Sequence, residues 1–208
     1  MHTPENGDAL WSHVQVDVVH LEETASGYVE AVIFVCRFTR EILAFPCRRD
    51  INSEQFLNIV TFGLTATKGR PCKMVSDRGS ILISTLCQFY YKAVRLEHVA
   101  ADAHMHTAVG ICERFNHTLR TFARAVYFDE QCQWDPFLPL LVLFYNAGVN
   151  PDTGYSPFYL NNGREPVLPW GALTGASTER LPAAFWHCSS SCLGERFKDT
   201  LDAGEGSP

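Results

Sequence analysis

The chain has 208 residues and a formal net charge of −6, and 46% of its residues are apolar and 12% aromatic. This composition excludes a disordered chain and favours one domain with a substantial core. The net negative charge argues against a protein that binds polyanions over its whole surface. Any contact with nucleic acid must therefore come from a local basic surface.

Eight cysteines are dispersed through apolar runs, and none forms a C-x-x-C pair. We interpret them as buried thiols of a reducing, intracellular compartment rather than as a disulfide framework. Cys188 and Cys192 lie beside His187 but lack a second ligand pair, so they are a weak zinc candidate. With no run of 18 apolar residues and no secretory signal pattern, we expect no contact with a membrane.

The first third of the chain predicts an antiparallel meander. Residues 1–10 are polar and are expected to be a linker. Apolar, Val-rich runs at 13–21, 28–39 and 41–48 predict three strands. Three consecutive strands separated by short turns favour an antiparallel opening to a mixed sheet.

Shorter strands then alternate with helices. The expected elements are a helix at 53–67 with Ser53 as its N-cap, a strand at 72–77, a helix at 84–93, a strand at 95–101, and helices at 110–129 and 134–148. Beyond residue 170 the sequence becomes rich in Gly, Ala, Ser and Thr, so we expect 171–208 to be a low-complexity, poorly ordered tail. The order of elements predicts one α/β domain.

Three carboxylates stand in unusual places. Asp17 interrupts an apolar strand, Asp77 ends another, and Glu113 lies near the expected start of the helix at 110–129. A buried, unpaired Asp costs several kcal/mol, roughly, whereas converging acids can hold hard cations through oxygen ligands. Two such ions support in-line phosphoryl displacement. The alternative is that all three acids are structural, with Glu113 complementing the helix dipole.

Asp17 and four sequence motifs, in chain order, resemble the retroviral-type integrase core. Asp17 lies in a first strand, Asp77 in SDRGS, and Glu113 in GxxERFNxTLR, with 35 residues between the last two acids. That spacing is the one for which the family's Asp-Asp-35-Glu triad is named. The segments WDPFLPLLVLFYN and TGYSPFYLNNGREPVLP are similar to those of gypsy-type LTR retrotransposon integrases. The resemblance covers roughly residues 11–169.

The resemblance implies an integrase catalytic core at 11–170 with an RNase H-like fold, in which helices flank a five-stranded mixed sheet. It implies a polynucleotidyl transferase that processes DNA 3′ ends and transfers them to target DNA. Asp17, Asp77 and Glu113 would be the catalytic residues and would bind two Mg²⁺ or Mn²⁺ ions. The implied partners are element ends and target DNA, with homo-oligomers in the complete protein and a nuclear location when functional.

A basic stripe follows Glu113 along the same helix and suits phosphate contacts that position DNA without reading its sequence. The candidate DNA-binding residues are Arg78, Arg114, Asn116, His117, Arg120 and Arg124. Lys68, Arg70 and Lys73 form a second basic cluster before the Asp77 strand. For both groups the alternative is an ordinary solvated face.

Several departures from the family leave other functions open. HMHTAVGIC replaces a loop resembling YHPQTDGQ, and we favour loop histidines over a metal pair for His104 and His106. Cys36 stands where relatives often have an Asp that is not a metal ligand. Neither an N-terminal zinc domain nor a C-terminal DNA-binding domain is expected in this chain. The main alternative is therefore an inactive or domesticated DNA- or protein-binding domain, and another is an unrelated RNase H-like nuclease.

Overall fold

The computed structural model describes residues 9–77, 79, 81–100, 106–127 and 133–168, with the side chains of 106–111, 113 and 125–127 outside that description. Most of the expected linker and the whole expected tail lie outside the described residues. So do Arg78, His104 and the Cys188–Cys192 pair. The domain boundaries therefore stay a prediction.

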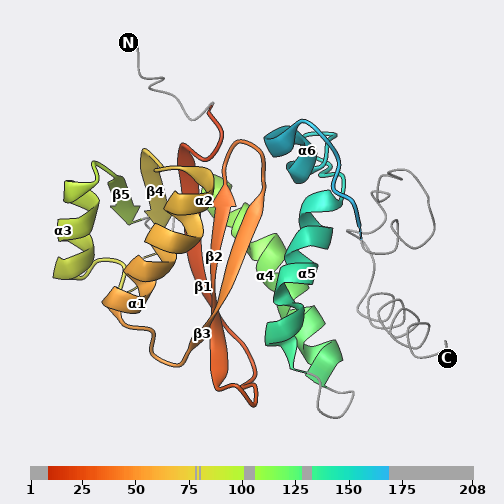
Figure 1. Cartoon of the computed structure of the whole chain (residues 1–208), viewed down its shortest axis with the longest axis horizontal. Coiled ribbons are helices and arrows are strands. Elements are labelled where there is room, and N and C mark those ends of the chain that lie inside the picture. Colours follow the sequence, from red (N-terminus) through yellow and green to blue (C-terminus); the bar gives the residue numbers. More distant parts are fainter. Residues whose placement is uncertain (1–8, 78, 80, 101–105, 128–132, 169–208) are drawn as a thin grey trace.

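A five-stranded mixed sheet forms the centre of the domain, as the sequence predicted (Figure 1). Its spatial order is β3-β2-β1-β4-β5, with β1 antiparallel to β2, β2 antiparallel to β3, and β4 parallel to both β1 and β5. The strands are β1 (His13–His20), β2 (Tyr28–Cys36), β3 (Ile42–Arg48), β4 (Lys73–Ser76) and β5 (Glu97–Ala100). The first three make the expected meander.

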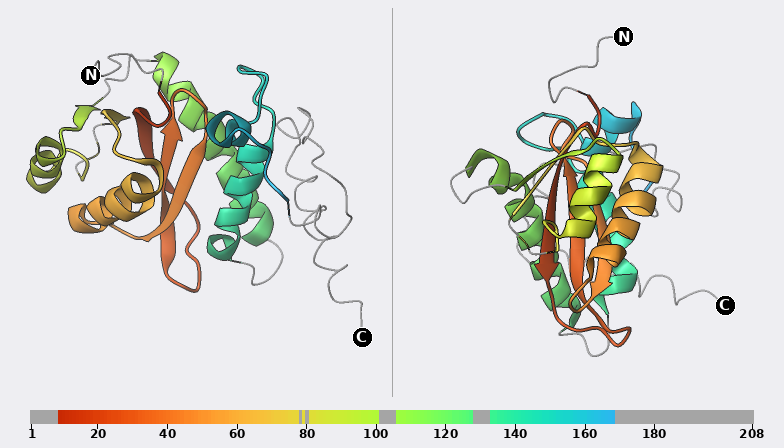
Figure 2. Two further views of the ribbon diagram at one scale, coloured as in Figure 1. Left: turned by 45° about the horizontal axis from the view of Figure 1, so that its top comes forward. Right: turned by 90° about the vertical axis from the view of Figure 1, so that its left-hand side faces the viewer.

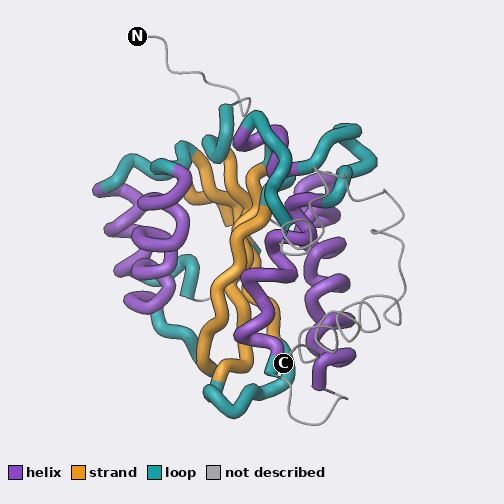
Figure 3. The backbone as a smooth tube through the Cα atoms, turned by 45° about the vertical axis from the view of Figure 1, so that its right-hand side comes forward, coloured by secondary structure: helices purple, strands orange, loops and turns teal. Residues whose placement is uncertain are grey.

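Helices cover both faces of the sheet, which Figure 2 shows from two further directions. One face carries α1 (Ser53–Asn58), η1 (Ile59–Thr65), α2 (Ala66–Lys68) and α3 (Thr85–Ala93). The other carries α4 (His106–Tyr127) and α5 (Trp134–Ala147), and the short α6 (Pro157–Asn162) follows α5. The tube in Figure 3 shows α4 and α5 side by side along the strands.

Alternation along β1 divides the core into two layers. Val14 and Val16 pack in the cluster that includes α1 and α3, whereas Val19 packs with α4 and α5. Because successive side chains of a strand point to opposite faces, the odd-numbered residues of β1 belong to the α4 side. This parity directs Asp17 toward α4.

The helix predicted at 53–67 exists, but its start and its interior differ from the prediction. Asn52, not Ser53, is the N-cap: its Oδ1 accepts from Gln55 N at 2.9 Å, and Gln55 Oε1 accepts from Asn52 N at 3.1 Å. This reciprocal capping box satisfies two backbone donors at once, which Ser53 could not do from one position later. The middle of the helix is the π-helical turn η1, which the apolar spacing did not indicate.

Helix α4 begins at His106, four residues earlier than predicted. His106, expected in a loop, is therefore the first helical residue. Glu113 becomes the eighth residue of the helix, beyond the first turn in which an acid gains from the helix dipole, so that alternative loses its basis. Phe115, Leu119 and Phe122 are buried as predicted, while the Val126 side chain lies outside the description.

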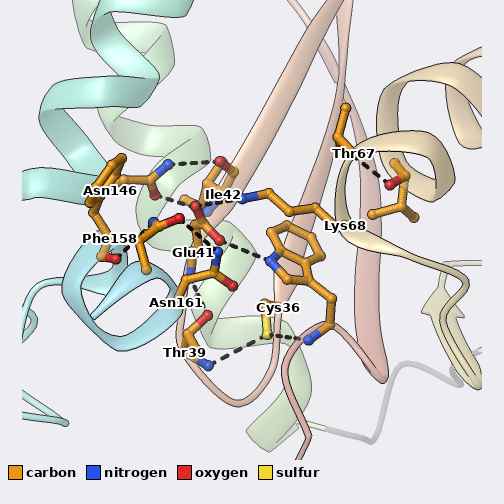
Figure 4. Close-up of polar contacts among 12 residues, drawn as sticks. Cys36, Thr39, Glu41, Ile42, Thr67, Lys68, Asn146, Phe158 and Asn161 are labelled. Carbon is orange, nitrogen blue, oxygen red and sulfur yellow. Dashed lines mark hydrogen bonds and ion pairs between the residues drawn. The ribbon is translucent and has the colours of Figure 1, made fainter. Parts of the chain in front are cut away.

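The YN pair of the WDPFLPLLVLFYN segment has a structural role. Asn146, at the end of α5, is buried and joins the edge strand β3 through Ile42 (Figure 4). Asn146 Oδ1 accepts from Ile42 N at 2.9 Å, and Asn146 Nδ2 donates to Ile42 O at 2.8 Å. These two bonds satisfy backbone groups of β3 and hold α5 against the sheet.

We expect Asn146→Ala to lower the free energy of unfolding by about 2–4 kcal/mol, because it leaves two buried backbone groups of Ile42 without partners. Urea denaturation measures this loss. The matched control is Asn58→Ala on α1, where the side chain is exposed and makes no capping bond, and a change within about 0.5 kcal/mol is expected. Equal effects of the two substitutions would contradict the role of Asn146.

The SPF segment is also explained by local structure. Ser156 is the N-cap of α6: its Oγ accepts from Tyr159 N at 2.9 Å and donates to Glu165 Oε2 at 2.7 Å. Gly163 ends the helix in the left-handed region, with φ of 69°. The Ser, Gly and Glu of this segment therefore hold a short helix in place.

The basic cluster before β4 is committed to internal contacts. Lys68 Nζ lies 2.8 Å from Oε1 of the buried Glu41, a pair drawn in Figure 4. Arg70 Nη1 donates to the Arg95 carbonyl at 2.7 Å, and Lys73 Nζ lies 2.9 Å from Glu97 Oε1. All three cations therefore already have partners within the protein, and Lys68 does not belong to a solvated face.

Of the cysteines in the described part of the chain, Cys36, Cys47, Cys87 and Cys112 are buried thiols, whereas Cys72 is exposed. Cys36 Sγ accepts hydrogen bonds from Trp11 N and Thr39 N at 3.3 and 3.5 Å, so it closes the turn after β2. Within the described ranges, no helix is long and apolar enough to cross a membrane.

Candidate active site

The parallel pairing of β1 with β4 brings the two aspartates together. The register pairs His13 with Lys73 and Gln15 with Val75. The ladder ends at Val75, two residues before Asp77, and Asp77 lies near enough to Asp17 to raise its pKa. By its parity in β1, Asp17 belongs to the α4 face of the sheet. Sequence reasoning found these acids but not the register that joins them, because β4 reaches β1 from 60 residues further along the chain.

Asp17 is half-buried, and both of its carboxylate oxygens accept hydrogen bonds. Its Oδ1 accepts from Val18 N at 2.8 Å, and its Oδ2 accepts from Asn116 Nδ2 at 2.5 Å. Asn116 lies on α4 and is only 6% exposed. It therefore does not belong to the solvated stripe in which the sequence placed it, because its amide ties α4 to the Asp17 carboxylate.

The pKa of Asp17 is raised above its ordinary value, principally because burial disfavours the charged form. The Asn116 and Val18 hydrogen bonds oppose that shift, repulsion from Asp77 adds to it, and attraction to Arg120 opposes it. Burial is therefore the larger cause of the raised pKa, and repulsion between the two carboxylates is a smaller one.

This shift predicts a pH-dependent gain from Asp17→Asn in the absence of metal. At Asp17 the folded state holds its proton more tightly than the unfolded state, so between pH 3.8 and the raised pKa the contribution of this group to stability falls as pH rises. The neutral variant escapes this loss. The difference in free energy of unfolding between Asp17→Asn and wild type should therefore shift in favour of the variant from pH 3 up to the raised pKa of Asp17. Above that pKa the difference should stay constant.

Urea denaturation with EDTA across pH 3–7 measures that advantage. Asp50→Asn is the control, because Asp50 is exposed and follows β3, two strands away from β1. A difference between Asp17→Asn and wild type that stays constant with pH would contradict the argument.

Asp77 follows β4 directly and is exposed. Its Oδ1 accepts from Gly79 N at 3.1 Å, which closes a tight turn at the carboxyl end of the strand. A Cβ at position 79 would lie 3.2 Å from that oxygen, so Gly79 permits the close approach. The Asp77 side chain is thus exposed at the end of β4, and its charge is near enough to Asp17 to raise the pKa of Asp17.

The third acid, Glu113, lies in α4 three residues before Asn116, but its side chain is outside the description. Among the described side chains, no three of His, Cys, Asp and Glu form a metal-binding group. The donors that are described suit a hard cation: two neighbouring carboxylates and the buried Asn116 Oδ1, which has no hydrogen-bond partner there. The residues present therefore fit Mg²⁺ or Mn²⁺.

The described basic residues of α4 face solvent. His117, Arg120 and Arg124 are exposed, in agreement with the predicted stripe. Arg114 is also exposed, and its Nη2 lies 3.6 Å from Asp152 Oδ2 in a solvent-accessible pair that contributes little to stability. Arg120 lies near enough to lower the pKa of Asp17, so the stripe passes beside the carboxylates.

Comparison with solved structures defines the fold as that of a retroviral-type integrase catalytic core, which is RNase H-like. The similar structures include a simian T-cell lymphotropic virus intasome in complex with PP2A regulatory subunit B56 gamma, with a TM-score of 0.65 and 20% identity over 79% of this chain and 58% of that one. The catalytic core domain of BIV integrase has a TM-score of 0.58 and 15% identity, over 73% of this chain and 93% of that one. The HTLV-2 integrase catalytic core domain in complex with magnesium, in a trimeric form, has a TM-score of 0.57 and 15% identity, over 74% of this chain and 97% of that one.

Relatives by sequence are retrotransposon polyproteins, in agreement with the resemblance to LTR retroelements; no family model matches the chain. The chain is 26% identical over 169 residues to the retrovirus-related Pol polyprotein from transposon 412 of Drosophila melanogaster, covering 80% of this chain and 13% of that protein. It is 22% identical over 158 residues to the transposon Tf2-3 polyprotein of Schizosaccharomyces pombe, covering 76% and 12%. The chain thus spans about an eighth of these relatives.

Proposed function

We propose that this chain is the catalytic core of a retroelement integrase, a metal-dependent polynucleotidyl transferase that processes DNA 3′ ends and joins them to target DNA. The observation that supports the proposal most is the parallel pairing of β1 with β4 ahead of Asp77, together with the influence of Asp77 on the pKa of Asp17 and the bond from Asn116 of α4 to Asp17. The polyprotein relatives and the fold support the same class of enzyme.

Glu113 completes the proposed site. Residues three apart on a helix are neighbours on its surface, and Asn116, three residues after Glu113, reaches Asp17. Asp17, Asp77 and Glu113 would hold two Mg²⁺ or Mn²⁺ ions. Divalent ions in such a site stabilise charge on the attacking and leaving oxygens of a phosphodiester exchange. Asn116 would orient Asp17, and the exchange needs positioning rather than a nucleotide energy source.

The basic stripe would place DNA over the carboxylates through phosphate contacts made by His117, Arg120 and Arg124. Arg78 and Arg114 are further candidates for such contacts, and copies of the chain would assemble on DNA in the complete protein. Contacts to phosphate make affinity dependent on salt and nearly independent of sequence.

We expect the double variant Arg120→Gln, Arg124→Gln to bind duplex DNA more weakly at all sequences, and the slope of log K against log salt concentration to fall by about 2. Fluorescence anisotropy at several salt concentrations measures both. Arg49→Gln is the matched control, since Arg49 is exposed and pairs with Glu23 at 3.5 Å on another part of the surface. An unchanged slope in the double variant would remove the stripe from the interface.

The experiment that tests the proposed activity is strand transfer by the full chain on a short DNA duplex with Mg²⁺ or Mn²⁺. Joined product that EDTA abolishes supports the proposal. DNA binding without any metal-dependent cleavage or joining would favour the second candidate, a non-catalytic DNA- or protein-binding descendant. The observation favouring that candidate is HMHTAVGIC, which departs from the family pattern ahead of Glu113.

A further inference from the structure

A buried serine next to Asp77 in the chain contacts a histidine of the neighbouring strand, and the proposed mechanism assigns no role to either residue. Ser76 is the last residue of β4 and is 2% exposed. Its Oγ makes two contacts, one of 2.7 Å with the Asp77 carbonyl oxygen and one of 2.8 Å with His98 Nε2. His98 lies on the neighbouring strand β5, where it pairs with Met74 in the register.

The direction of these bonds follows from counting protons. A carbonyl oxygen only accepts, so the Ser76 hydroxyl must donate its single proton to Asp77. The same hydroxyl then has only lone pairs left for His98, so His98 Nε2 must carry a proton and donate it. The chain of donors runs from His98 to Ser76 to the Asp77 carbonyl.

Packing holds the imidazole in this orientation. The ring of Tyr91, on α3, lies 4.8 Å from the His98 ring between centroids, and Tyr91 is 2% exposed. Burial lowers the pKa of His98, which favours the neutral ring at neutral pH. In a neutral ring that donates from Nε2, Nδ1 carries the lone pair.

The Asp77 peptide lies just beyond the sheet. On β4, the pairing with β1 ends at Val75 and the pairing with β5 ends at Ser76, so neither pairing includes Asp77. Its carbonyl is instead held by Ser76, while its carboxylate accepts from Gly79 N. The hydroxyl thus fixes one side of the turn and the Gly79 amide fixes the other.

We propose that His98 is a positioning residue for Asp77, acting through the Ser76 hydroxyl to hold the peptide that carries this carboxylate. The inference rests on the proposed function for its metal ion, but the hydrogen-bond chain itself belongs to the protein alone. Groups behind a metal ligand commonly change metal affinity or activity by about 10–100-fold when they are removed.

The first test needs neither metal nor DNA. Long-range proton–nitrogen correlation spectra of the imidazole rings report which nitrogen of neutral His98 is protonated. We expect the Nε2–H form, with the His98→Gln spectrum identifying the signal by its loss. The Nδ1–H form would overturn the proposal.

The second test compares three variants in Mn²⁺ titrations of the full chain without DNA. His98→Leu removes the donor and Ser76→Ala removes the hydroxyl with a smaller change of volume, and each should weaken Mn²⁺ binding about 10-fold or more. His98→Gln restores an N–H donor near the Nε2 position and should recover affinity to within about 3-fold. A merely structural role predicts no such recovery.

Wild-type Mn²⁺ affinity in both His98→Leu and Ser76→Ala would overturn the inference. In strand transfer, His98→Leu should lower kcat and leave the KM for DNA unchanged, because the basic stripe is intact. Because Mn²⁺ affinity is measured without DNA, a His98-dependent affinity in a wild type that joins no DNA would contradict the proposed function alone and support the inference.

Discussion

Asp77→Asn should fold, bind DNA, and lose strand transfer. The substitution removes one ligand charge at nearly constant volume, and its amide oxygen can still accept from Gly79 N. Because repulsion from Asp77 contributes to the raised pKa of Asp17, the variant should melt at or above the wild-type temperature in EDTA. Mg²⁺ or Mn²⁺ stabilises wild type by mass action, so the variant should also lose most of the metal-induced rise in Tm.

Thermal melts with EDTA, Mg²⁺ or Mn²⁺ and a strand-transfer assay measure these effects. The control is Asp50→Asn, an exposed acid after β3, which should keep both the metal-induced shift and the activity of wild type. A metal-induced shift of wild-type size in Asp77→Asn would mean that this acid is not a ligand. If wild type binds DNA but shows neither a metal-induced rise in Tm nor metal-dependent cleavage, the three acids do not bind catalytic metal ions in this protein.

Leu119→Ala should lower the free energy of unfolding by about 2–5 kcal/mol, the range for a leucine truncated in a packed core. Leu119 is fully buried on α4 and packs in the cluster that joins α4 and α5 to the sheet. This cluster holds the helix that carries Glu113 and Asn116, so its packing also fixes the site.

Urea denaturation of Leu119→Ala beside Leu86→Ala measures this loss. Leu86 lies on α3 and is 49% exposed, so its truncation should change stability by no more than about 0.5 kcal/mol. A loss below about 0.5 kcal/mol for Leu119→Ala would mean that α4 presents another face to the sheet.

Much of the fold could be predicted because its signals are local. Alternation and β-branched residues indicated the strands, and the three-four spacing of Phe115, Leu119 and Phe122 indicated the buried face of α4. The π-helical turn at Ile59–Thr65 and the true N-cap Asn52 were missed. The first has no periodic signature, and the second was one residue from an equally acceptable cap, Ser53.

The candidate site was predictable as a set of residues but not as an arrangement. Unusual placement of Asp17 and Asp77 marked them as candidates, yet only the pairing of β1 with β4, which precedes Asp77, brings the two parts of the chain together. Asn116 was assigned to the solvated stripe because helical periodicity alone does not show which polar residue meets a strand. The Ser76–His98 contact depends on β5 pairing, which no local pattern specifies.

The most direct test of the central claim is anomalous diffraction from crystals of the full chain soaked in Mn²⁺. We predict Mn²⁺ density between the carboxylates of Asp17 and Asp77, with the Glu113 carboxylate among the ligands. Mn²⁺ bound elsewhere, or a Glu113 carboxylate on the far side of α4 from Asp17, would contradict the proposed active site.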